Sequence, residues 1–311
     1  MTVSPLRVGL GASAAFRRDE TSPLFGFLRD FAPFLTAGNV TLHAVGATHD
    51  AVAYSGILDP GSLIRLPPAR EGGVIRLTAM VVPDMAGESG LDWVIYLLDP
   101  TDPITVFPEM QALKRQCVVH GKPFLTNRAA ASEWCALAWS RRADPAGPEL
   151  TSRIAQWVRP DHLDREAIGL IAHDSQKHTM LEFARTHRTV LSRFGRRLAT
   201  GTTGGLLNGE IPPRMAAEAE TLRHFIPTEP ENWVTRYQSG PRGGDAQIAV
   251  EVLNGTCRRL IFFEDPHVAR EHEADIQLLE RATRFAPAGC LCVNDRASAE
   301  LWIESLGLLL R

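Results

Sequence analysis

Short apolar runs alternate along the chain with longer stretches in which apolar residues recur three and four positions apart. In the second half, the apolar runs predict strands at 167–172, 197–200, 233–238, 259–263 and 290–293. Between them, stretches such as "QKHTMLEFARTH" and "ADIQLLERATRF" have the spacing of amphipathic helices. Strands that alternate with helices imply parallel βαβ units, so we predict an α/β fold whose open parallel sheets carry helices on both faces.

This pattern occurs twice in the chain. "LRVGLGAS" (6–13) is similar to "EAIGLIAH" (166–173), "HAVGATHDAV" (43–52) to "LATGTTGGLL" (198–207), and "VIYLLDP" (94–100) to "LIFFEDP" (260–266). The matching landmarks lie about 160 residues apart throughout, as expected of an internal repeat. We therefore predict tandem domains at 1–142 and 166–311, joined by a polar, proline-containing linker at 143–165.

Composition excludes several classes of protein. The net charge of −3 gives no electrostatic basis for binding nucleic acid or an anionic membrane. No apolar run approaches the roughly 18 residues that a membrane span needs, and the N-terminus lacks a signal-peptide layout. The five cysteines form no C-x-x-C pair, which argues against a disulfide framework and a zinc site. We expect a cytoplasmic protein with buried thiols and no metal.

Polar residues follow the predicted strands of the second copy, where parallel sheets bind their ligands. "AHDSQK" supplies His173, Asp174 and Lys177, although Asp174 is also a plausible helix cap. "ATGTTGG" then supplies Thr200, Gly201, Thr202 and Thr203. Hydroxyls and glycines at the start of a helix suit a phosphate group, and an ordinary threonine-capped turn is the alternative.

The third and fourth strands of this copy add carboxylates and a histidine. The irregular turn "SGPRGGDAQ" contains Ser239 and Gly240 and delivers Asp245 to the start of a helix, either as a cap or as a base held against a substrate carbon. The fourth strand ends at Asp265, and two further polar residues, His272 and Asp275, follow. A lone histidine indicates little, but the predicted fold brings all four strand ends to one edge of the sheet.

Taken in order, "GLIAHDSQK", "ATGTTG", "SGPRGGDAQ" and "LIFFEDPHVAREHEAD" resemble the methylglyoxal synthase family over roughly residues 166–305. The resemblance implies two tandem flavodoxin-like domains, of which the second converts dihydroxyacetone phosphate to methylglyoxal and inorganic phosphate. It also implies that no cofactor is needed and that the protein is a homo-oligomer, since bacterial members are typically homohexamers.

The resemblance further implies a role for each residue. Asp245 would be the general base, His272 would hydrogen-bond the oxygens of the ene-diol, and Asp275 and Asp265 would orient His272. The phosphate and the rest of the substrate would be held by the remaining residues, with Asp174 and Arg281 in support: His173, Lys177, Thr200, Gly201, Thr202, Thr203, Ser239 and Gly240.

Two departures from the family stand out. The connection between Thr203 and Ser239 is longer, with an insertion at 209–232 in which "RMAAEAETLRHF" (214–225) predicts an extra helix that serves as a lid, an oligomer contact or surface decoration. The family's C-terminal tail carries a phosphate-binding arginine for which Arg311 is a poor substitute. Inhibition by phosphate is therefore left open.

The first copy lacks most of these polar residues. It has Ser13, Ala14 and Arg17 opposite His173, Asp174 and Lys177, and Val106 and Glu109 opposite His272 and Asp275. We expect its third strand to lead into "VPDMAGESG" (82–90), where Glu88 is at best a displaced carboxylate. We predict a non-catalytic domain kept for packing and assembly, with ligand sensing as the alternative.

Two wider hypotheses follow from the repeat. Three two-domain chains would mimic a hexamer. The competing function for the whole protein is a non-catalytic sensor of a phosphorylated metabolite.

Overall fold

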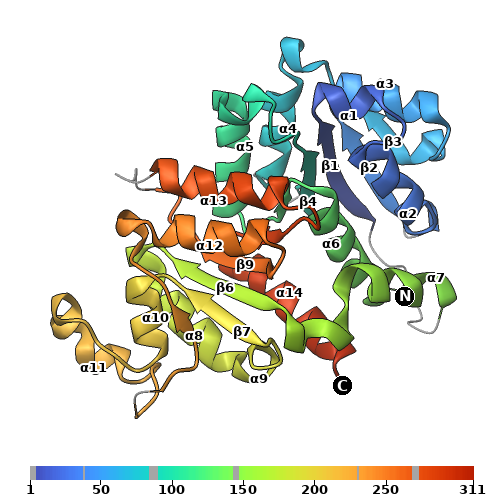
Figure 1. Ribbon diagram of the computed structural model, residues 1–311. Coiled ribbons are helices and arrows are strands. Elements are labelled where there is room, and N and C mark those ends of the chain that lie inside the picture. The colour runs from blue at the N-terminus through green and yellow to red at the C-terminus, as the bar shows by residue number, and fades with distance from the viewer. Residues whose placement is uncertain (1–4, 38, 84–89, 143–146, 230, 268–272) are drawn as a thin grey trace. The chain divides into compact units, whose positions relative to one another are not determined.

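The computed structural model describes residues 5–37, 39–83, 90–142, 147–229, 231–267 and 273–311 (Figure 1). The chain divides into two compact units, Met1–Val158 and Arg159–Arg311. Each unit contains one five-stranded sheet in which every pairing is parallel. Each is described below by itself.

The two sheets have the same topology. The first has the order β3-β2-β1-β4-β5 and the second the order β10-β9-β6-β7-β8, which is the same sequence of strands read from the opposite edge. The strands are β1 (Leu6–Ala12), β2 (Val40–Ala44), β3 (Leu63–Arg65), β4 (Trp93–Leu97), β5 (Phe124–Leu125), β6 (Ala167–Ala172), β7 (Arg196–Ala199), β8 (Thr235–Arg236), β9 (Cys257–Phe263) and β10 (Leu291–Val293).

This topology confirms the predicted α/β class with two tandem open parallel sheets. Within that class, the order 3-2-1-4-5 differs from the order 2-1-3-4-5 of flavodoxin itself. In each sheet, the order in which the chain adds strands reverses between the first and fourth strands. In the second unit these strands are β6 and β9. Ligands of such sheets bind at this reversal, outside the carboxyl ends of the strands.

Helices cover both faces of each sheet. In the first unit, one face carries α1 (Ala14–Arg18), α2 (Pro23–Ala37), α3 (Gly46–Ser55) and α6 (Arg128–Ser140), and the other carries α4 (Gly73–Val81) and α5 (Pro108–Val119). In the second unit, α12 (Gly244–Leu253) and α13 (Glu273–Phe285) lie together on one face (Figure 1). The opposite face carries α8 (Lys177–Thr186), α9 (Arg188–Leu191), α10 (Gly201–Leu207) and α14 (Arg296–Leu309).

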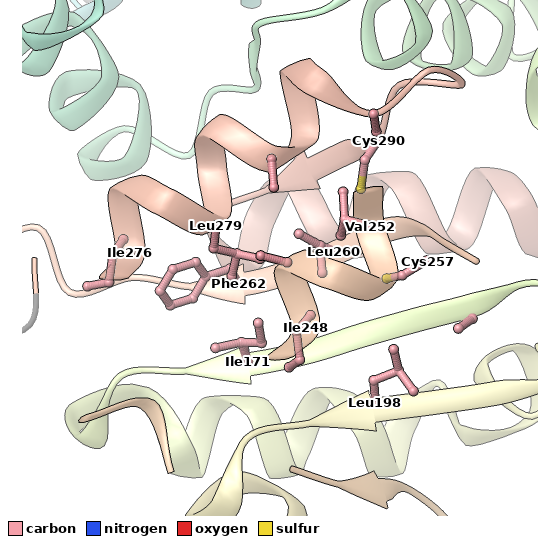
Figure 2. Close-up of a cluster of buried hydrophobic side chains, with 14 residues drawn as sticks. Ile171, Leu198, Ile248, Val252, Cys257, Leu260, Phe262, Ile276, Leu279 and Cys290 are labelled. Carbon is pink, nitrogen blue, oxygen red and sulfur yellow. The ribbon is translucent and has the colours of Figure 1, made fainter. Parts of the chain in front are cut away.

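An apolar layer joins α12 and α13 to the second sheet. Figure 2 shows Ile171 and Phe262 from the strands packed with Ile248 of α12 and Leu279 of α13. All four side chains are buried, and each fully buried side chain of this size contributes about 1.5–3 kcal/mol to folding. Every residue of β6 is buried, as expected of a central strand covered on both faces. This packing fixes where the strands end, and therefore where the residues after them lie.

The segment predicted to be a linker is largely helical. It contains α7 (Pro148–Arg153), a π-helical turn at Ile154–Val158 and a 3-10 helix at Pro160–Arg165. Its first part packs on the first unit, because Arg153 Nη1 lies 3.3 Å from an Asp30 carboxylate oxygen and Arg128 lies 5.3 Å from the Trp157 ring centroid.

The prediction of one continuous helix within the insertion is wrong. The structure has a 3-10 helix at Pro213–Glu218, followed by the single turn α11 (Ala219–Leu222). Met215 has φ −109° and ψ 15°, which interrupts the helical backbone after the prolines. The insertion packs on α8 through a ring contact of 4.4 Å between the Phe225 and His178 centroids. It packs on α9 through an ion pair of 2.5 Å between Glu231 and Arg188.

The third strand of the first unit lies earlier than the sequence indicated. β3 is Leu63–Arg65 and leads into "LPPAREGGV" (66–74), whereas "VPDMAGESG" follows α4. The predicted assignment was wrong because β3 has three residues, of which two are exposed, so it gives almost no apolar signal. Glu88 lies outside the described residues.

No helix in the described part of the chain combines the length and the apolar character that crossing a bilayer requires.

Candidate functional site

A cavity of about 400 Å³ lies at the carboxyl ends of β6, β7 and β8 in the second unit. It brings together most of the residues that the sequence singled out. The lining residues are Ile171, Ala172, His173, Asp174, Lys177, Thr200, Thr202, Thr203, Ser239, Gly240, Pro241, Arg242, Asp245 and Phe262. Its position is the one at which open parallel sheets bind ligands.

His173 is fixed by two hydrogen bonds at the end of β6. Its backbone N–H donates to the carbonyl of Phe263 at 3.0 Å, and its Nδ1 accepts from the backbone N–H of Asp265 at 2.8 Å. A ring nitrogen that accepts carries no proton, so the neutral imidazole has its proton on Nε2. The ring is buried and meets Phe262 edge to face, with 5.1 Å between centroids. His173 is thus held as a hydrogen-bond donor in the cavity wall.

Lys177 and Asp174 form an ion pair beside His173. Asp174 begins the 3-10 turn Asp174–Gln176, and Lys177 is the first residue of α8. The lysine is buried while the aspartate is mostly exposed. A buried ammonium group needs such a partner to remain charged, so Asp174 supports Lys177 as a cation at the cavity wall.

Residues 200–203, which we call the threonine loop, follow β7 and supply hydroxyl groups to the cavity. Gly201 packs so closely on the neighbouring turn that a Cβ there would lie 2.7 Å from the backbone nitrogen of Ser239. Thr200 is the N-cap residue of α10, but its side chain makes no capping hydrogen bond. Thr203 Oγ1 is buried and has no hydrogen-bond partner among the described residues. The alternative of a threonine-capped turn is therefore not observed, and a buried hydroxyl is available to a ligand.

The glycine-rich turn places Asp245. Residues Gly240–Arg242 form a 3-10 turn, and Gly243 follows with φ 89°, in the left-handed region that favours glycine. A Cβ on Gly244 would lie 1.9 Å from the carbonyl oxygen of Gln238, so this position requires glycine as well. The N-cap of α12 is Gly243, not Asp245, which lies in the first turn of the helix and is 2 % exposed. A buried carboxylate at a helix N-terminus is favoured by the helix dipole.

An ion-pair network holds the strand that leads into this turn. Tyr237 Oη donates to Glu251 of α12 at 2.5 Å, and Arg196 Nη2 contacts the same carboxylate oxygen at 2.6 Å. Burial raises the pKa of Glu251, but hydrogen bonds from Thr256, Tyr237 and Arg196 outweigh it and bring the pKa to about 2. Glu251 is therefore ionised at neutral pH and fixes β7, β8 and α12 to one another.

Four predicted residues lie elsewhere. Gly201 lines an adjoining cavity, described below. The Asp265 carboxylate accepts hydrogen bonds from Ser175 Oγ at 2.6 Å and from the backbone N–H of His267 at 2.9 Å. Asp275 is half-buried on α13, and Arg281 is exposed on the same helix with its guanidinium 5.4 Å from the Phe285 ring centroid. Within the described structure, Asp265, Asp275 and Arg281 do not line the cavity.

His272, the predicted partner of the ene-diol, lies outside the described residues. Among the residues that the structure does describe, no group of three or more His, Cys, Asp or Glu side chains could hold a metal ion.

Sequence reasoning missed five lining residues. Arg242 and Pro241 stand inside the quoted motif "SGPRGGDAQ", where attention fell on the serine, the glycines and the aspartate. The apolar lining residues Ile171, Ala172 and Phe262 belong to buried strands and cannot be told from core residues by sequence alone.

The first unit has the same turn without the carboxylate. Gly72 has φ 82°, and a Cβ on Gly73 would lie 1.9 Å from the carbonyl oxygen of Pro67. Val74 then occupies the position that Asp245 has in the second unit, and Glu71 that of Arg242. Thr48, the counterpart of Thr203, accepts a hydrogen bond of 3.1 Å from the backbone N–H of Ala12. The hydroxyl that remains at this position is therefore used within the fold of the first unit.

Comparison with known proteins identifies similar sequences. A methylglyoxal synthase of Ralstonia nicotianae is 38% identical over 144 residues, which are 46% of this chain and 90% of that protein. A methylglyoxal synthase of Agrobacterium fabrum is 39% identical over 141 residues, or 45% of this chain and 94% of that protein. No family model matches the chain.

Among solved structures, a methylglyoxal synthase from Elizabethkingia anophelis is 26% identical and covers 45% of this chain and 78% of its own, with a TM-score of 0.32.

Proposed function

This chain belongs to the methylglyoxal synthase family, and we propose that its second unit converts dihydroxyacetone phosphate to methylglyoxal and inorganic phosphate. The observation that carries the proposal is the position of Asp245. It is a buried carboxylate in the wall of a cavity that also contains a buried hydroxyl, a buried lysine and a histidine with a fixed donor. A base next to phosphate-binding groups is the combination that this reaction requires.

In the first step, Asp245 removes a proton from the substrate carbon that bears the hydroxyl group beside the carbonyl. The electron pair of the broken C–H bond moves to the carbonyl oxygen and forms an ene-diolate. Hydrogen bonds from Nε2–H of His173 and from His272 would stabilise this oxygen. Removing one such donor typically costs about 10²–10³ in rate, so the histidines contribute a large share of catalysis.

In the second step, the ene-diolate expels phosphate. The hydroxyl of the ene-diolate loses its proton and becomes the aldehyde carbonyl, and the C=C electron pair moves to the carbon that bears the phosphate. The C–O bond to the phosphate breaks and its electron pair leaves with the phosphate, which takes up the hydroxyl proton. The proton held by Asp245 returns to the enolate oxygen, and the enol tautomerises to methylglyoxal. Elimination requires this C–O bond to stand out of the ene-diol plane. The hydroxyls of Thr200, Thr202 and Thr203 with Lys177 would hold the phosphate in that orientation and stabilise its charge.

The experiment is to incubate the full-length protein with dihydroxyacetone phosphate and to measure methylglyoxal and phosphate release. We expect both products in equal amounts, and we expect Asp245→Asn to lower the rate about 10²–10⁴-fold because a positioned base is lost. Binding of the substrate without product from the parent protein would instead support a sensor of phosphorylated metabolites. Equal activity in the variant would show that Asp245 is not the base.

For the first unit we propose a structural role in packing and assembly, because Val74 replaces the base and Thr48 is used internally. We further propose that three chains assemble so that their six units take the place of a hexamer. Light scattering that gives the mass of a monomer would contradict this assembly.

We also propose that the protein acts in the cytoplasm. All five cysteines are free thiols and four of them are buried, which fits a reducing compartment.

A further inference from the structure

Arg242 lies where two cavities meet. It lines the 400 Å³ cavity together with Thr202 and Ser239, and the same three residues line an adjoining cavity of about 560 Å³. Its side chain is exposed and makes no hydrogen bond or ion pair with any described residue. We propose that Arg242 binds the phosphate group of the substrate and so selects phosphorylated substrates. This inference rests on the proposed function of the cavity.

The backbone that carries Arg242 is held in place. Its N–H donates to the carbonyl of Ser239 at 2.9 Å, the N–H of Gly243 donates to the carbonyl of Gly240 at 2.9 Å, and Gly244 N–H donates to Ser239 at 3.0 Å. The positive φ of Gly243 and the close packing of Gly244 on the Gln238 carbonyl fix the backbone that follows Arg242. The Cα of Arg242 therefore has a defined position at the entrance, and ligand binding has to order only the side chain.

The charges of the other lining residues favour a cation at the position of Arg242. The charged lining residues are Asp174, Lys177, Arg242 and Asp245. Lys177 is already paired with Asp174, and Asp245 is a buried carboxylate. Without Arg242 the lining would carry one net negative charge, which would oppose a phosphate monoester dianion. Arg242 neutralises that charge and presents donors whose planar arrangement matches phosphate oxygens.

A second observation points to a ligand at the same place. Thr203 Oγ1 is buried, 2 % of the residue is exposed, and this hydroxyl has no hydrogen-bond partner among the described residues. A buried hydroxyl without a partner destabilises the fold unless a ligand or water satisfies it. Thr203 on one side and Arg242 on the other would together hold a phosphate between the threonine loop and the glycine-rich turn.

The first unit provides an internal contrast. Its equivalent turn carries Glu71 in place of Arg242 and Val74 in place of Asp245. A glutamate at this position would repel a phosphate. The proposed base and the proposed phosphate-binding arginine are thus present in one copy and both absent from the other.

The experiment compares Arg242→Met and Arg242→Lys with Arg193→Met in the full-length protein. Arg193 is an exposed arginine just before β7, on the side of the sheet where the strands begin, whereas the cavity lies where they end. Its replacement therefore makes the same change in charge away from the cavity. The readouts are kcat and KM for dihydroxyacetone phosphate, and the affinity for inorganic phosphate by titration calorimetry. We would also measure how dihydroxyacetone phosphate binds to Asp245→Asn protein, with and without Arg242→Met. This shows whether Arg242 contributes to binding of the phosphate ester as well as to binding of inorganic phosphate.

We expect Arg242→Met to weaken binding of both the ester and free phosphate about tenfold to a hundredfold, as the loss of a hydrogen bond to a charged group predicts. Arg242→Lys should recover part of this loss and Arg193→Met should change neither affinity nor kinetics. Unchanged KM and phosphate affinity in Arg242→Met protein whose unfolding midpoint is that of the parent would overturn the inference. If the parent makes no methylglyoxal but binds phosphate through Arg242, the proposed function fails and the inference stands.

Discussion

The backbone N–H of Asp265 donates a hydrogen bond of 2.8 Å to Nδ1 of His173. In the first unit, the N–H of Asp99 donates one of 3.0 Å to Oγ of Ser13 at the equivalent position. Both copies of the fold therefore require an acceptor at the end of their first strand. The histidine meets that requirement with one nitrogen and retains the proton on the other, so its structural and chemical roles can be separated.

We predict that His173→Ser keeps the fold and loses activity. Serine supplies the acceptor, as Ser13 does, so the backbone N–H of Asp265 stays paired. The loss of unfolding free energy should then be limited to the packing of the ring on Phe262, about 1–2 kcal/mol. The donor at Nε2 is lost, so kcat should fall about 10²-fold or more. His173→Phe removes both groups and should lower stability as well. Urea unfolding and steady-state kinetics on the same samples would check this, and full activity of the serine variant would contradict a chemical role for the ring.

A matched pair of glycine substitutions tests whether the two turns serve different purposes. Gly244→Ala and Gly73→Ala both place a Cβ 1.9 Å from a carbonyl oxygen, so each should cost about 2–4 kcal/mol of unfolding free energy. Only Gly244→Ala should also lower kcat, because only its turn carries the base. The measurements are chemical unfolding and product formation at a temperature where both variants are folded. Inactivation by Gly73→Ala under those conditions would show that the first unit contributes to the reaction.

The buried pair of Arg259 and Glu166 should dominate the stability of the second unit. Arg259 is 1 % exposed on β9, and its Nη1 lies 2.5 Å from Glu166 just before β6, with Arg159 at 3.3 Å and Arg258 at 3.7 Å from the same carboxylate. Glu166→Gln removes the carboxylate charge that is paired with the buried Arg259, which should cost about 3–5 kcal/mol. Urea unfolding measures the loss. A change below about 1 kcal/mol would mean that solvent compensates the arginines.

The pH dependence of stability should contain a contribution from His43 on β2. Burial, and then the charge of Arg7, lowers the pKa of His43 below its ordinary value of 6.5. Below pH 6.5 the unfolded chain takes up a proton that the folded imidazole does not, so stability falls as the pH drops through this range. His43→Leu should flatten the curve below about pH 6.5. Parallel curves for parent and variant in urea unfolding series would contradict the shift.

The sequence was sufficient for the fold class because the central strands of the second copy, β6 and β9, are buried apolar runs separated by stretches with helical spacing. It was insufficient where a strand is short and exposed. β3 has one buried residue, so the first copy's glycine-rich turn was overlooked and its missing base was sought near Glu88 and not at Val74. In the insertion, the spacing of a helix was present, but the backbone at Met215 interrupts it.

The sequence also did not show in which direction side chains point, and therefore which of them line the cavity. Its position at a strand end, and the family resemblance, placed Asp265 with the reactive residues. They did not show that its carboxylate also closes a turn with Ser175 and His267, as Asp99 does with Thr101 in the first unit. Arg242 was overlooked for the opposite reason, because an arginine in a polar turn has no distinctive pattern until the fold shows which cavity it lines. Both outcomes depend on contacts between segments far apart in the sequence.

The shared turn has a consequence for protein engineering. Gly72 and Gly73 already give the first unit the backbone conformation that presents Asp245 in the second unit. This turn could therefore carry the same two charged side chains after Glu71→Arg and Val74→Asp, with no change to its backbone. The backbone of the turn was thus retained after the first copy lost the side chains that it presents in the second.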